Sequence, residues 1–534
     1  MNATISEPKH RKEDIHKLGL PVDSLSNRSS GDIPVLGASR TNVGGSQTSK
    51  THANDNDKQN SNNQNNAQIA QPKLPLFTGP TNERQKAVVD AFKHAWAGYR
   101  KYAWGKDHLR PKTKTNHEWY GLGLTIVDSL DTLIIMGLKE EFQEASRWVS
   151  EQLTFDKKAH VNLFETTIRV LGGLLSAFHL SGDSMFVDKA KDLAQRLIGA
   201  FDTPSKVVPY SDIHLVSRKG RLPGWGAQSS LSEVSSLQLE FRDLSRITGE
   251  SLYEQLTFNT SRHIHQLGCE KHDGLCPMFI NPKTGQWQPS TTITLGARAD
   301  SYYEYLLKQW LQTGKRIDWL REDYVRAMQS AWNKLVRYSE PNKLTFVGEL
   351  VSSKTFSPKM DHLVCFLGGT LALGAVNGLP KEHMDWAKQL GHTCWQMYAS
   401  TPTGLGPEIA HFNMILTPKR EDLYIKPLDA HSLLRPEAIE AWFYLYRLTG
   451  EKIWQDYGWK AFEAIEKHAK LPNGYSSVQN VKKIPVVHKD HMESFFLAET
   501  LKYLYLLLAD DQSLLPLTKY VFNTEAHPLP IYSE

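Results

Sequence analysis

The chain from about residue 80 onward alternates between two kinds of segment in which hydrophobic positions have helical spacing. Segments of the first kind are apolar on nearly every side, as in residues 441–446, and a helix of that type is buried. Segments of the second kind have one apolar face, as at Phe186, Ala190 and Leu193. The pattern therefore predicts buried helices that amphipathic helices cover from outside.

Short turns separate the two kinds of segment at intervals of 45 to 72 residues. Glycine suits such turns because it supplies the left-handed residue that ends a helix. The turns lie at Gly137, Gly182, Gly249, Gly314, Gly378, Gly450 and Asp510–Asp511. Seven units predict an all-α fold, an (α/α)7 barrel of seven inner and seven outer helices. The alternative is an open solenoid, but the long polar connections lie on one side only and the period exceeds that of most solenoid repeats.

The two ends of the chain depart from this pattern. Residues 1–78 are rich in Ser, Asn and Gln and cannot bury enough apolar surface to order themselves, so we expect a disordered stem before a domain of residues 79–534. Neither a run of 18 apolar residues nor an apolar leader is present, so we expect no membrane span and no signal peptide. Residues 520–525 are strand-like, and we expect the C-terminal segment to plug the barrel from the side of the turns.

Composition narrows the possible partners and the compartment. The 62 Lys+Arg nearly balance the 58 Asp+Glu, which argues against a nucleic-acid-binding protein. The 14 Trp, 20 Tyr and 20 Phe offer many rings to pack or to stack against a sugar. Four cysteines, without the spacing of a zinc site, are equally compatible with two disulfides and with reduced thiols.

Acidic residues recur 13 to 17 residues before the turns, where the buried helices begin. They are Glu165, Glu233, Asp300, Asp361, Glu437 and Glu493. At about 1.5 Å per residue they lie roughly 20–25 Å from the turns, at the opposite mouth of the barrel. Helix capping accounts for any one of them but not for six. Converging carboxylates suit two chemistries, ligation of a hard cation and general acid–base catalysis, and glycoside hydrolysis uses a pair of them.

Longer motifs in the chain can be recognised. Residues 123–133 (GLTIVDSLDTL), 164–174 (FETTIRVLGGL), 296–305 (GARADSYYEY), 360–365 (MDHLVC) and 522–528 (FNTEAHP) closely resemble class I α-1,2-mannosidases, glycoside hydrolase family 47. The resemblance extends from about residue 84 to the C-terminus and implies the same (α/α)7 barrel. Arg298 stands where Golgi-type members carry a non-basic residue, so the chain resembles the endoplasmic-reticulum type more closely.

The resemblance implies roles for individual residues. Glu165, Asp300 and Glu437 match the catalytic acids of an inverting reaction. Glu437 would be the base that activates water, and either Asp300 or Glu165 would be the acid, acting through a second water. Thr524 would bind Ca²⁺ through its carbonyl and hydroxyl oxygens, and Glu437, Glu499 and Glu525 would hold waters of the ion. The positions that match the sugar subsites are Arg169, Arg298, Asp361, His362, Arg435 and Phe495.

The resemblance also bears on the cysteines and on one glycine. Cys365 and Cys394 match the family disulfide, which implies the oxidising lumen of the secretory pathway, in the endoplasmic reticulum or the Golgi. Cys269 and Cys276 lie outside the family pattern and could pair or stay free. Gly368 stands where proline is usual, a change that we expect to loosen a loop.

These observations predict a calcium-dependent inverting glycosidase that removes terminal α-1,2-linked mannose from high-mannose N-glycans, in glycoprotein processing and endoplasmic-reticulum-associated degradation. The alternative is a degradation factor on the same barrel that binds glycans without hydrolysing them. We expect a monomer with no nucleic-acid partner. Membrane association would require the family's usual type II anchor, which this sequence does not show.

Overall fold

The computed structural model describes residues 77–224, 226–417 and 421–532 of the 534-residue chain. The predicted stem lies outside the described residues, apart from Phe77 and Thr78. Among the residues that the structure describes, no helix combines the length and the apolar character needed to cross a membrane.

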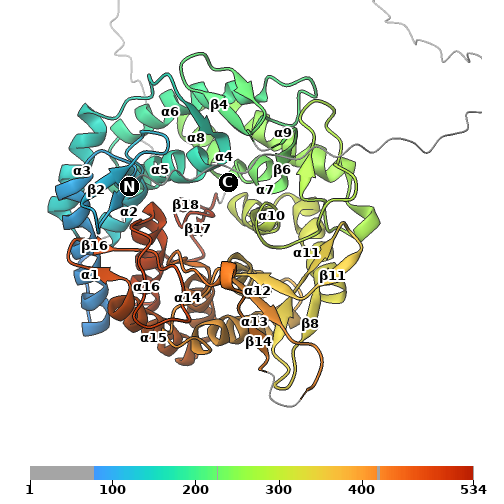
Figure 1. Cartoon of the computed structure of the whole chain (residues 1–534). Coiled ribbons are helices and arrows are strands. Elements are labelled where there is room, and N and C mark those ends of the chain that lie inside the picture. Colours follow the sequence, from blue (N-terminus) through green and yellow to red (C-terminus); the bar gives the residue numbers. More distant parts are fainter. Residues whose placement is uncertain (1–76, 225, 418–420, 533–534) are drawn as a thin grey trace, which may run out of the picture. The chain divides into compact units, whose positions relative to one another are not determined.

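Helices form two concentric layers in the part of the chain that follows the stem (Figure 1). The inner layer consists of α2 (Leu124–Ile135), α4 (Leu163–Glu165) continuing through η1 (Thr166–Leu171) into α5 (Gly172–Ser181), α7 (Leu231–Ser235) and α8 (Gln238–Thr248), α10 (Asp300–Gln312), η4 (His362–Cys365) and α12 (Phe366–Val376), α14 (Glu437–Thr449), and η6 (Phe496–Thr500) and α16 (Leu501–Leu507). The outer layer consists of α1 (Glu83–Tyr102), α3 (Lys139–Glu151), α6 (Met185–Leu197) with η2 (Ile198–Phe201), α9 (Leu252–Leu267), α11 (Asp318–Lys334), α13 (Glu382–Ala399) and α15 (Ile453–His468).

Neighbouring inner helices pack on one another from α2 through α5, α8, α10, α12 and α14 to α16, and η6 packs back on α2. Each inner helix also packs on an outer helix that adjoins it in sequence, for example α5 on α6 and α12 on α13, while α1 covers α16. The prediction of a predominantly helical barrel is therefore confirmed.

Glycine residues in the left-handed conformation end inner helices at the predicted turns. Gly182, Gly249 and Gly450 follow α5, α8 and α14 with φ of 75°, 73° and 72°, and each donates its backbone N–H to a carbonyl four residues earlier. A residue with a Cβ would be strained in this conformation, which explains why glycine marks these positions. The predicted turn positions are correct here.

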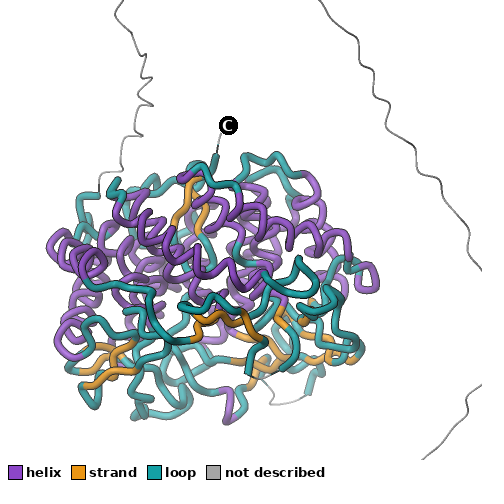
Figure 2. Tube along the Cα trace, turned by 90° about the horizontal axis from the view of Figure 1, so that it is seen from above, coloured by secondary structure: helices purple, strands orange, loops and turns teal. Residues whose placement is uncertain are grey.

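The long connections carry short antiparallel strands, which the sequence did not predict. The sheets are β1 (His108–Arg110) with β2 (Thr115–His117); β3 (His160–Asn162), β4 (Asp212–His214) and β5 (Gly220–Arg221); β6 (Ser229–Ser230) with β7 (Phe279–Ile280); β8 (Val336–Tyr338) with β9 (Thr345–Val347); β10 (Glu349–Val351) with β11 (Thr355–Ser357); β12 (Lys359–Asp361), β13 (Ile409–Phe412) and β14 (Leu423–Tyr424); and β15 (Lys470–Leu471) with β16 (Gly474–Tyr475). Strands of two to four residues are too short for an alternating pattern to reveal them in the sequence. Figure 2 shows them gathered at one end of the helices.

The C-terminal segment forms the hairpin of β17 (Tyr520–Phe522) and β18 (Pro528–Pro530), which enters the barrel from the end opposite to the other strands (Figure 2). The hairpin packs against α5, α8 and α10. The chain that follows the hairpin is held at the end of the barrel where the glycine turns lie. There Tyr532 donates its backbone N–H to the carbonyl of Gln312, 2.9 Å away, at the end of α10. The strand-like plug therefore lies where the sequence predicts it.

Gly368 lies inside helix α12 and is buried, so the expectation of a loosened loop was wrong. A Cβ at Gly368 would lie 3.2 Å from the Cβ of Ala441 on α14. At Gly369, a Cβ would lie 2.6 Å from the ring of Tyr444. The glycine pair allows α12 and α14 to approach closely, and it acts in packing rather than in a loop.

Candidate functional site

A cavity of about 450 Å³ opens where the inner helices begin. Its wall includes most of the predicted site residues, namely Glu165, Arg169, Arg298, Asp300, Arg435, Glu437, Phe495, Glu499, Thr524 and Glu525. Residues more than 350 positions apart thus meet at one site.

The three predicted catalytic carboxylates stand at helix starts. Asp300 is the first residue of α10, and Glu437 is the first residue of α14. Glu165 closes the short helix α4, whose start is capped by the side chain of Asn162, which accepts a hydrogen bond from the backbone N–H of Glu165 at 3.0 Å. Three separate inner helices therefore each bring one carboxylate to the cavity.

The carboxylate of Glu437 is contacted by the imidazole of His362 and by the guanidinium of Arg435. His362 Nδ1 lies 2.7 Å from Glu437 Oε2, and Arg435 Nη1 lies 4.0 Å from Glu437 Oε1. Arg435 is itself fixed by a forked interaction with the carboxylate of Glu408, with contacts of 2.7 to 2.9 Å. Burial alone would raise the pKa of Glu437, but the hydrogen bond with His362 and the charge of Arg435 hold that pKa below its ordinary value. Glu437 is therefore a carboxylate at neutral pH.

Asp300 has a contrasting environment. Its Oδ1 accepts hydrogen bonds from the Ser232 hydroxyl at 2.8 Å and from the backbone N–H of Ser301 at 2.9 Å. Burial outweighs these bonds and raises the pKa of Asp300 to about 7. The two carboxylates, Asp300 and Glu437, thus differ in charge near neutral pH, which is the arrangement that acid–base catalysis requires.

Arg169 is the centre of an ion-pair network on one wall. Its Nε donates to Glu165 at 2.9 Å, and its Nη1 contacts the carboxylates of Glu525 and, at 3.5 Å, Asp128. The guanidinium also lies 5.8 Å from the ring of Phe495, at the same distance as that of Arg435. Phe495 therefore has two cationic neighbours, which holds its ring at the cavity wall.

Two of the predicted site residues on the wall lie in π-helical segments. Arg169 lies in η1, and Glu499 lies in η6. Such segments are rare and occur often at functional sites, because an extra residue in the turn rotates the following side chains to a new direction. The sequence carries no pattern from which these segments could be predicted.

Asp361 and His362 do not belong to the cavity wall. Asp361 lies 2.8 Å from Lys359 Nζ and accepts the backbone N–H of Ala297 at 3.3 Å, while His362 contacts Glu437 from behind. Both residues support wall residues, and their role in sugar binding remains a prediction.

The donor set for calcium fits a hard cation. Thr524 lies at the tip of the C-terminal hairpin, half-buried, and Glu437, Glu499 and Glu525 line the same cavity. Burial, followed by the charge of Glu437, raises the pKa of Glu499 well above its ordinary value, and burial raises that of Glu525 although Arg169 opposes it. Crowded, buried carboxylates are stabilised by a divalent cation.

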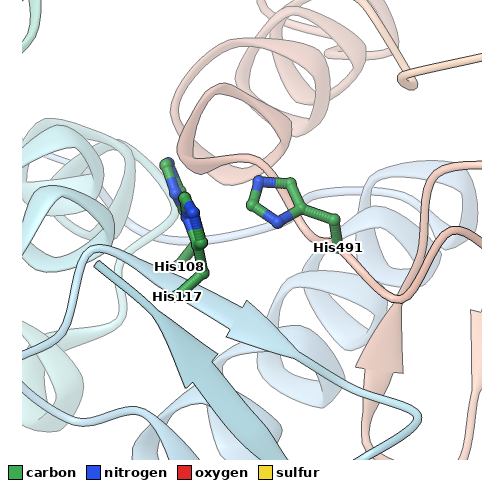
Figure 3. Close-up of side chains that lie close together, drawn as sticks. All are labelled: His108, His117 and His491. Atoms are coloured by element: carbon green, nitrogen blue, oxygen red, sulfur yellow. The ribbon is translucent and has the colours of Figure 1, made fainter. Parts of the chain in front are cut away.

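Among the described residues, one group of three His, Cys, Asp or Glu side chains has its ligand atoms within 4.8 Å of one another. This group is His108, His117 and His491, outside the cavity wall (Figure 3). Among the described residues, the cavity carboxylates form no such compact group.

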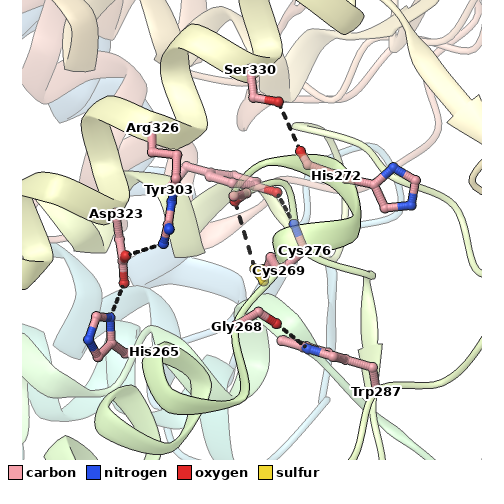
Figure 4. Close-up of a disulfide and its surroundings, with 11 residues drawn as sticks. His265, Gly268, Cys269, His272, Cys276, Trp287, Tyr303, Asp323, Arg326 and Ser330 are labelled. Atoms are coloured by element: carbon pink, nitrogen blue, oxygen red, sulfur yellow. Dashed lines mark hydrogen bonds and ion pairs between the residues drawn. A yellow bond between two sulfur atoms is a disulfide. The ribbon is translucent and has the colours of Figure 1, made fainter.

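Both pairs of cysteines are joined as disulfides. Cys365–Cys394 links η4 to α13, with a Cα–Cα distance of 6.0 Å, as the resemblance implied. Cys269–Cys276 closes a loop after α9, which settles the alternative that the sequence left open. Tyr303 of α10 accepts the backbone N–H of Cys276 at 3.1 Å, so this loop is anchored on the inner layer (Figure 4).

Some wall residues escaped the sequence analysis. Glu304 and Glu440 line the cavity, and Lys308 Nζ, which pairs with Glu304, lies 3.8 Å from Glu440. Burial raises the pKa of Glu440 to about 8. Glu304 follows Asp300 by four positions and Glu440 follows Glu437 by three, so a search for acids on the same helix face would have found both.

Trp119 and Glu233 also line the cavity. Trp119 lines the cavity with a partly exposed ring, which suits stacking on a sugar. Glu233, which the sequence singled out, also lines it, and its Oε1 accepts the side-chain amide of Asn162 at 2.9 Å. Glu233 and Ser230 form a reciprocal cap at the start of α7, so Glu233 has a structural task as well.

Known proteins share both the sequence and the fold of this chain. Residues 91–531 match the model of the family described as "Glycosyl hydrolase family 47". The chain is 56% identical over 459 residues to "Endoplasmic reticulum mannosyl-oligosaccharide 1,2-alpha-mannosidase" from Rattus norvegicus, covering 85% of this chain and 69% of that one. The protein of the same name from Homo sapiens is 55% identical over 454 residues, covering 85% and 64%.

A solved structure extends the comparison. An alpha-1,2-mannosidase from Trichoderma reesei superposes with a TM-score of 0.79 at 29% identity, covering 85% of this chain and all of that chain. The family model spans well over half of the sequence, and the identity to the relatives is high along the same region. The resemblance seen in the sequence motifs is confirmed, and the chain belongs to glycosyl hydrolase family 47.

Proposed function

We propose that this protein is a calcium-dependent, inverting α-1,2-mannosidase that removes terminal mannose from high-mannose N-glycans. The observation that carries the proposal is the cavity in which Glu165, Asp300 and Glu437 meet from three inner helices beside Thr524. The activity and compartment named for the relatives from Rattus norvegicus and Homo sapiens support this substrate and the lumen of the endoplasmic reticulum. There the enzyme would act in glycoprotein processing and degradation.

The (α/α)7 arrangement is part of the proposal. It is supported by the order of packing, in which inner helices follow one another around the cavity and outer helices alternate with them in sequence. In such a barrel the starts of all inner helices face one mouth. This explains why acids at helix starts, far apart in the sequence, reach one cavity.

The environments of the carboxylates support a different role for each of them. Glu437 is ionised and held by His362, so it takes the proton of the attacking water as general base. Asp300 retains a proton up to about pH 7, so it is the acid that protonates the departing sugar oxygen, directly or through one water. The carboxyl group of Glu165 is bound by the guanidinium of Arg169, whose Nε lies 2.9 Å away, and this fixed position suits Glu165 to orient the sugar.

Calcium would be held by the oxygens of Thr524, with Glu437, Glu499 and Glu525 holding its waters. When bound, the ion would fix the sugar hydroxyls and neutralise charge among the buried carboxylates. Phe495, between Arg169 and Arg435, and Trp119 offer ring faces to the sugar.

The test is incubation with a nine-mannose N-glycan, with the products resolved by branch and the anomer of the first released mannose followed by NMR. We expect release of β-mannose in calcium, loss of release with a chelator and recovery when calcium is added back. Binding of the glycan without turnover in calcium would favour the non-hydrolytic degradation factor. Release of α-mannose would contradict inversion.

A further inference from the structure

We infer that His108, His117 and His491 form a binding site for a divalent transition-metal ion of the zinc type, beside the sugar cavity. One ligand nitrogen from each ring lies within 4.8 Å of the others. The ring centroids are 5.9 Å apart for His108 and His117, 4.8 Å for His108 and His491, and 5.3 Å for His117 and His491. Figure 3 shows His491 facing the other two rings, which lie side by side.

The backbone fixes this convergence. His108 and His117 are directly opposite each other in the antiparallel pair β1–β2. Leu109, next to His108, forms a bridge with Met492, whose backbone N–H donates to the Leu109 carbonyl at 3.0 Å. His491 is thereby placed against the hairpin by main-chain pairing, so the three rings are held by ordered backbone from two distant parts of the chain.

Two ring nitrogens in the group have no partner among the residues that the structure describes. His108 Nδ1 and His117 Nδ1 are buried and make no hydrogen bond there, and only 4% of the His108 side chain is exposed. A buried nitrogen without a partner loses its hydrogen bond to water on folding and makes none in the protein, which destabilises the folded state. A bound metal ion would give these nitrogens the missing partner.

Glu493 supplies the outer support that metal-binding histidines use. Its Oε2 lies 3.3 Å from His491 Nε2 and 3.8 Å from His108 Nε2. A carboxylate in this position orients the rings and makes them better ligands by accepting from the nitrogen that does not face the metal. The same carboxylate would offset part of the charge of a divalent ion.

The ligand chemistry selects the ion. Three imidazoles are borderline-soft nitrogen donors, which suit Zn²⁺ and neighbouring first-row metals, whereas Ca²⁺ requires oxygen ligands. The site would leave a fourth position for water. It is therefore chemically separate from the proposed calcium site.

The site would stiffen one wall of the cavity. Trp119, which lines the cavity, has its ring 6.2 Å from that of His108. Ser494, three residues after His491, accepts from Arg169 at 3.2 Å, and Phe495 follows it. A metal at the three histidines would tie these residues to the β1–β2 hairpin.

The chain provides a matched control for the test. His160 and His214 are also opposite each other in an antiparallel pair, β3–β4, with ring centroids 4.9 Å apart. They belong to no group of three ligands among the described residues. Replacing one of them removes a cross-strand histidine without affecting the proposed site.

The experiment is a titration of the full-length, tag-free protein with ZnCl₂ in excess CaCl₂, followed by calorimetry and thermal unfolding. We expect one equivalent bound by wild type and by His160→Ala, with at least tenfold weaker binding and loss of the thermal shift in His117→Ala. Glu493→Gln should weaken binding by about 10- to 100-fold. Equal binding by His117→Ala and wild type, or equal loss in His160→Ala, overturns the inference.

A spectroscopic measurement on wild type does not depend on any variant folding. CoCl₂ in place of ZnCl₂ should give the visible absorption bands of a four-coordinate, nitrogen-rich site, and one equivalent of ZnCl₂ should abolish them. Absence of these bands at saturating CoCl₂ overturns the inference.

Discussion

The imidazole of His362 joins Glu437 to Tyr398. His362 Nδ1 lies 2.7 Å from Glu437 Oε2, and His362 Nε2 lies 2.8 Å from the Tyr398 hydroxyl. With both nitrogens engaged, the ring has one orientation, and it presents the same nitrogen to the carboxylate at all times. Glu437 is therefore positioned, and its pKa lowered, by a histidine that does not itself line the cavity, together with Arg435, which does.

Replacing Glu437 by Gln should abolish turnover while sparing glycan binding. The amide keeps the shape of the side chain but cannot take a proton from water, so kcat should fall by about 10² or more. Single-turnover kinetics and calorimetric glycan binding measure the two quantities separately. Turnover within a few-fold of wild type would show that another group is the base.

Replacing His362 by Ala should change the pH profile as well as the rate. The hydrogen bond and charge of His362 lower the pKa of Glu437 against the effect of burial, so their loss raises that pKa. The base then becomes protonated at higher pH, and the acidic limb of kcat/KM moves upward. Tyr398→Phe is the control, because it removes only the hydrogen bond between the Tyr398 hydroxyl and His362 Nε2 and should move the acidic limb less. An unmoved limb in His362→Ala would exclude this positioning role.

Asp300 should set the alkaline limb of the pH–activity profile. Its pKa is about 7, so the protonated form that donates to the leaving oxygen disappears as pH rises above 7. Wild-type activity should fall in that range, and Asp300→Asn should lose about 10² in kcat together with the limb. Glu165→Gln, a carboxylate change on another inner helix, should keep a limb near pH 7. If the limb persisted in Asp300→Asn and vanished in Glu165→Gln, Glu165 would be the acid.

The sequence predicted features that depend on local pattern. The glycine turns, the acids at helix starts and the strand-like segment near Thr524 all follow from the pattern within one segment. The contact between His362 and Glu437 does not, since 75 residues separate them and only the packing of α12 against α14 brings them together. The same holds for His108 and His491, whose approach depends on a single main-chain bridge between distant segments.

The acids inside the cavity were missed for a different reason. Glu304 and Glu440 lie one helical turn beyond Asp300 and Glu437, among residues that read as a buried apolar helix. A charged residue in such a segment is costly unless it is paired, and Lys308 lies close to both acids. That lysine, also embedded in apolar sequence, was the overlooked signal.

Arg298 should govern how many mannoses are removed. It is exposed at the cavity wall, its guanidinium lies 5.7 Å from the Phe279 ring, and its backbone has φ of 78°. A left-handed non-glycine residue at a binding site is held there by its surroundings, which fixes the direction of the side chain. Arg298→Leu should broaden trimming beyond one branch with kcat for the first cleavage within a few-fold of wild type.

The measurement for Arg298 is the branch-resolved product distribution over time from a nine-mannose glycan. Arg298→Lys keeps the charge but not the fork of donors, so it should show an intermediate distribution if several sugar hydroxyls are held at once. Identical product patterns in wild type and Arg298→Leu would place branch selection in other residues.

The C-terminal hairpin is tied to the barrel by buried charges. His527 lies 2.8 Å from Asp131 and 3.2 Å from Asp128, and Lys502 contacts Asp131 at 2.8 Å and the carbonyl of Ala526 at 2.7 Å. Removing the residues from Tyr520 onward would take His527 away from Asp128 and Asp131 and the Ala526 carbonyl away from Lys502, at a cost of about 3–5 kcal/mol for a broken buried pair. We expect such a truncated protein to lose activity and to unfold easily, so a point substitution is the sharper test of calcium binding.

Thr524→Ala should separate calcium binding from folding. The Thr524 side chain is half-buried and makes no hydrogen bond that the fold needs, since its one described contact runs from its backbone N–H to Tyr305 at 3.4 Å. The unfolding temperature in chelator should therefore stay close to that of wild type. A ligand that binds only the folded state stabilises it by RT ln(1 + [L]/Kd), so wild type should gain unfolding temperature with added calcium, and Thr524→Ala should gain much less. Thr524→Ser, which keeps both oxygens, should behave as wild type. If Thr524→Ala gained as much as wild type, the ion would bind elsewhere, and the role proposed for the hairpin tip would be wrong.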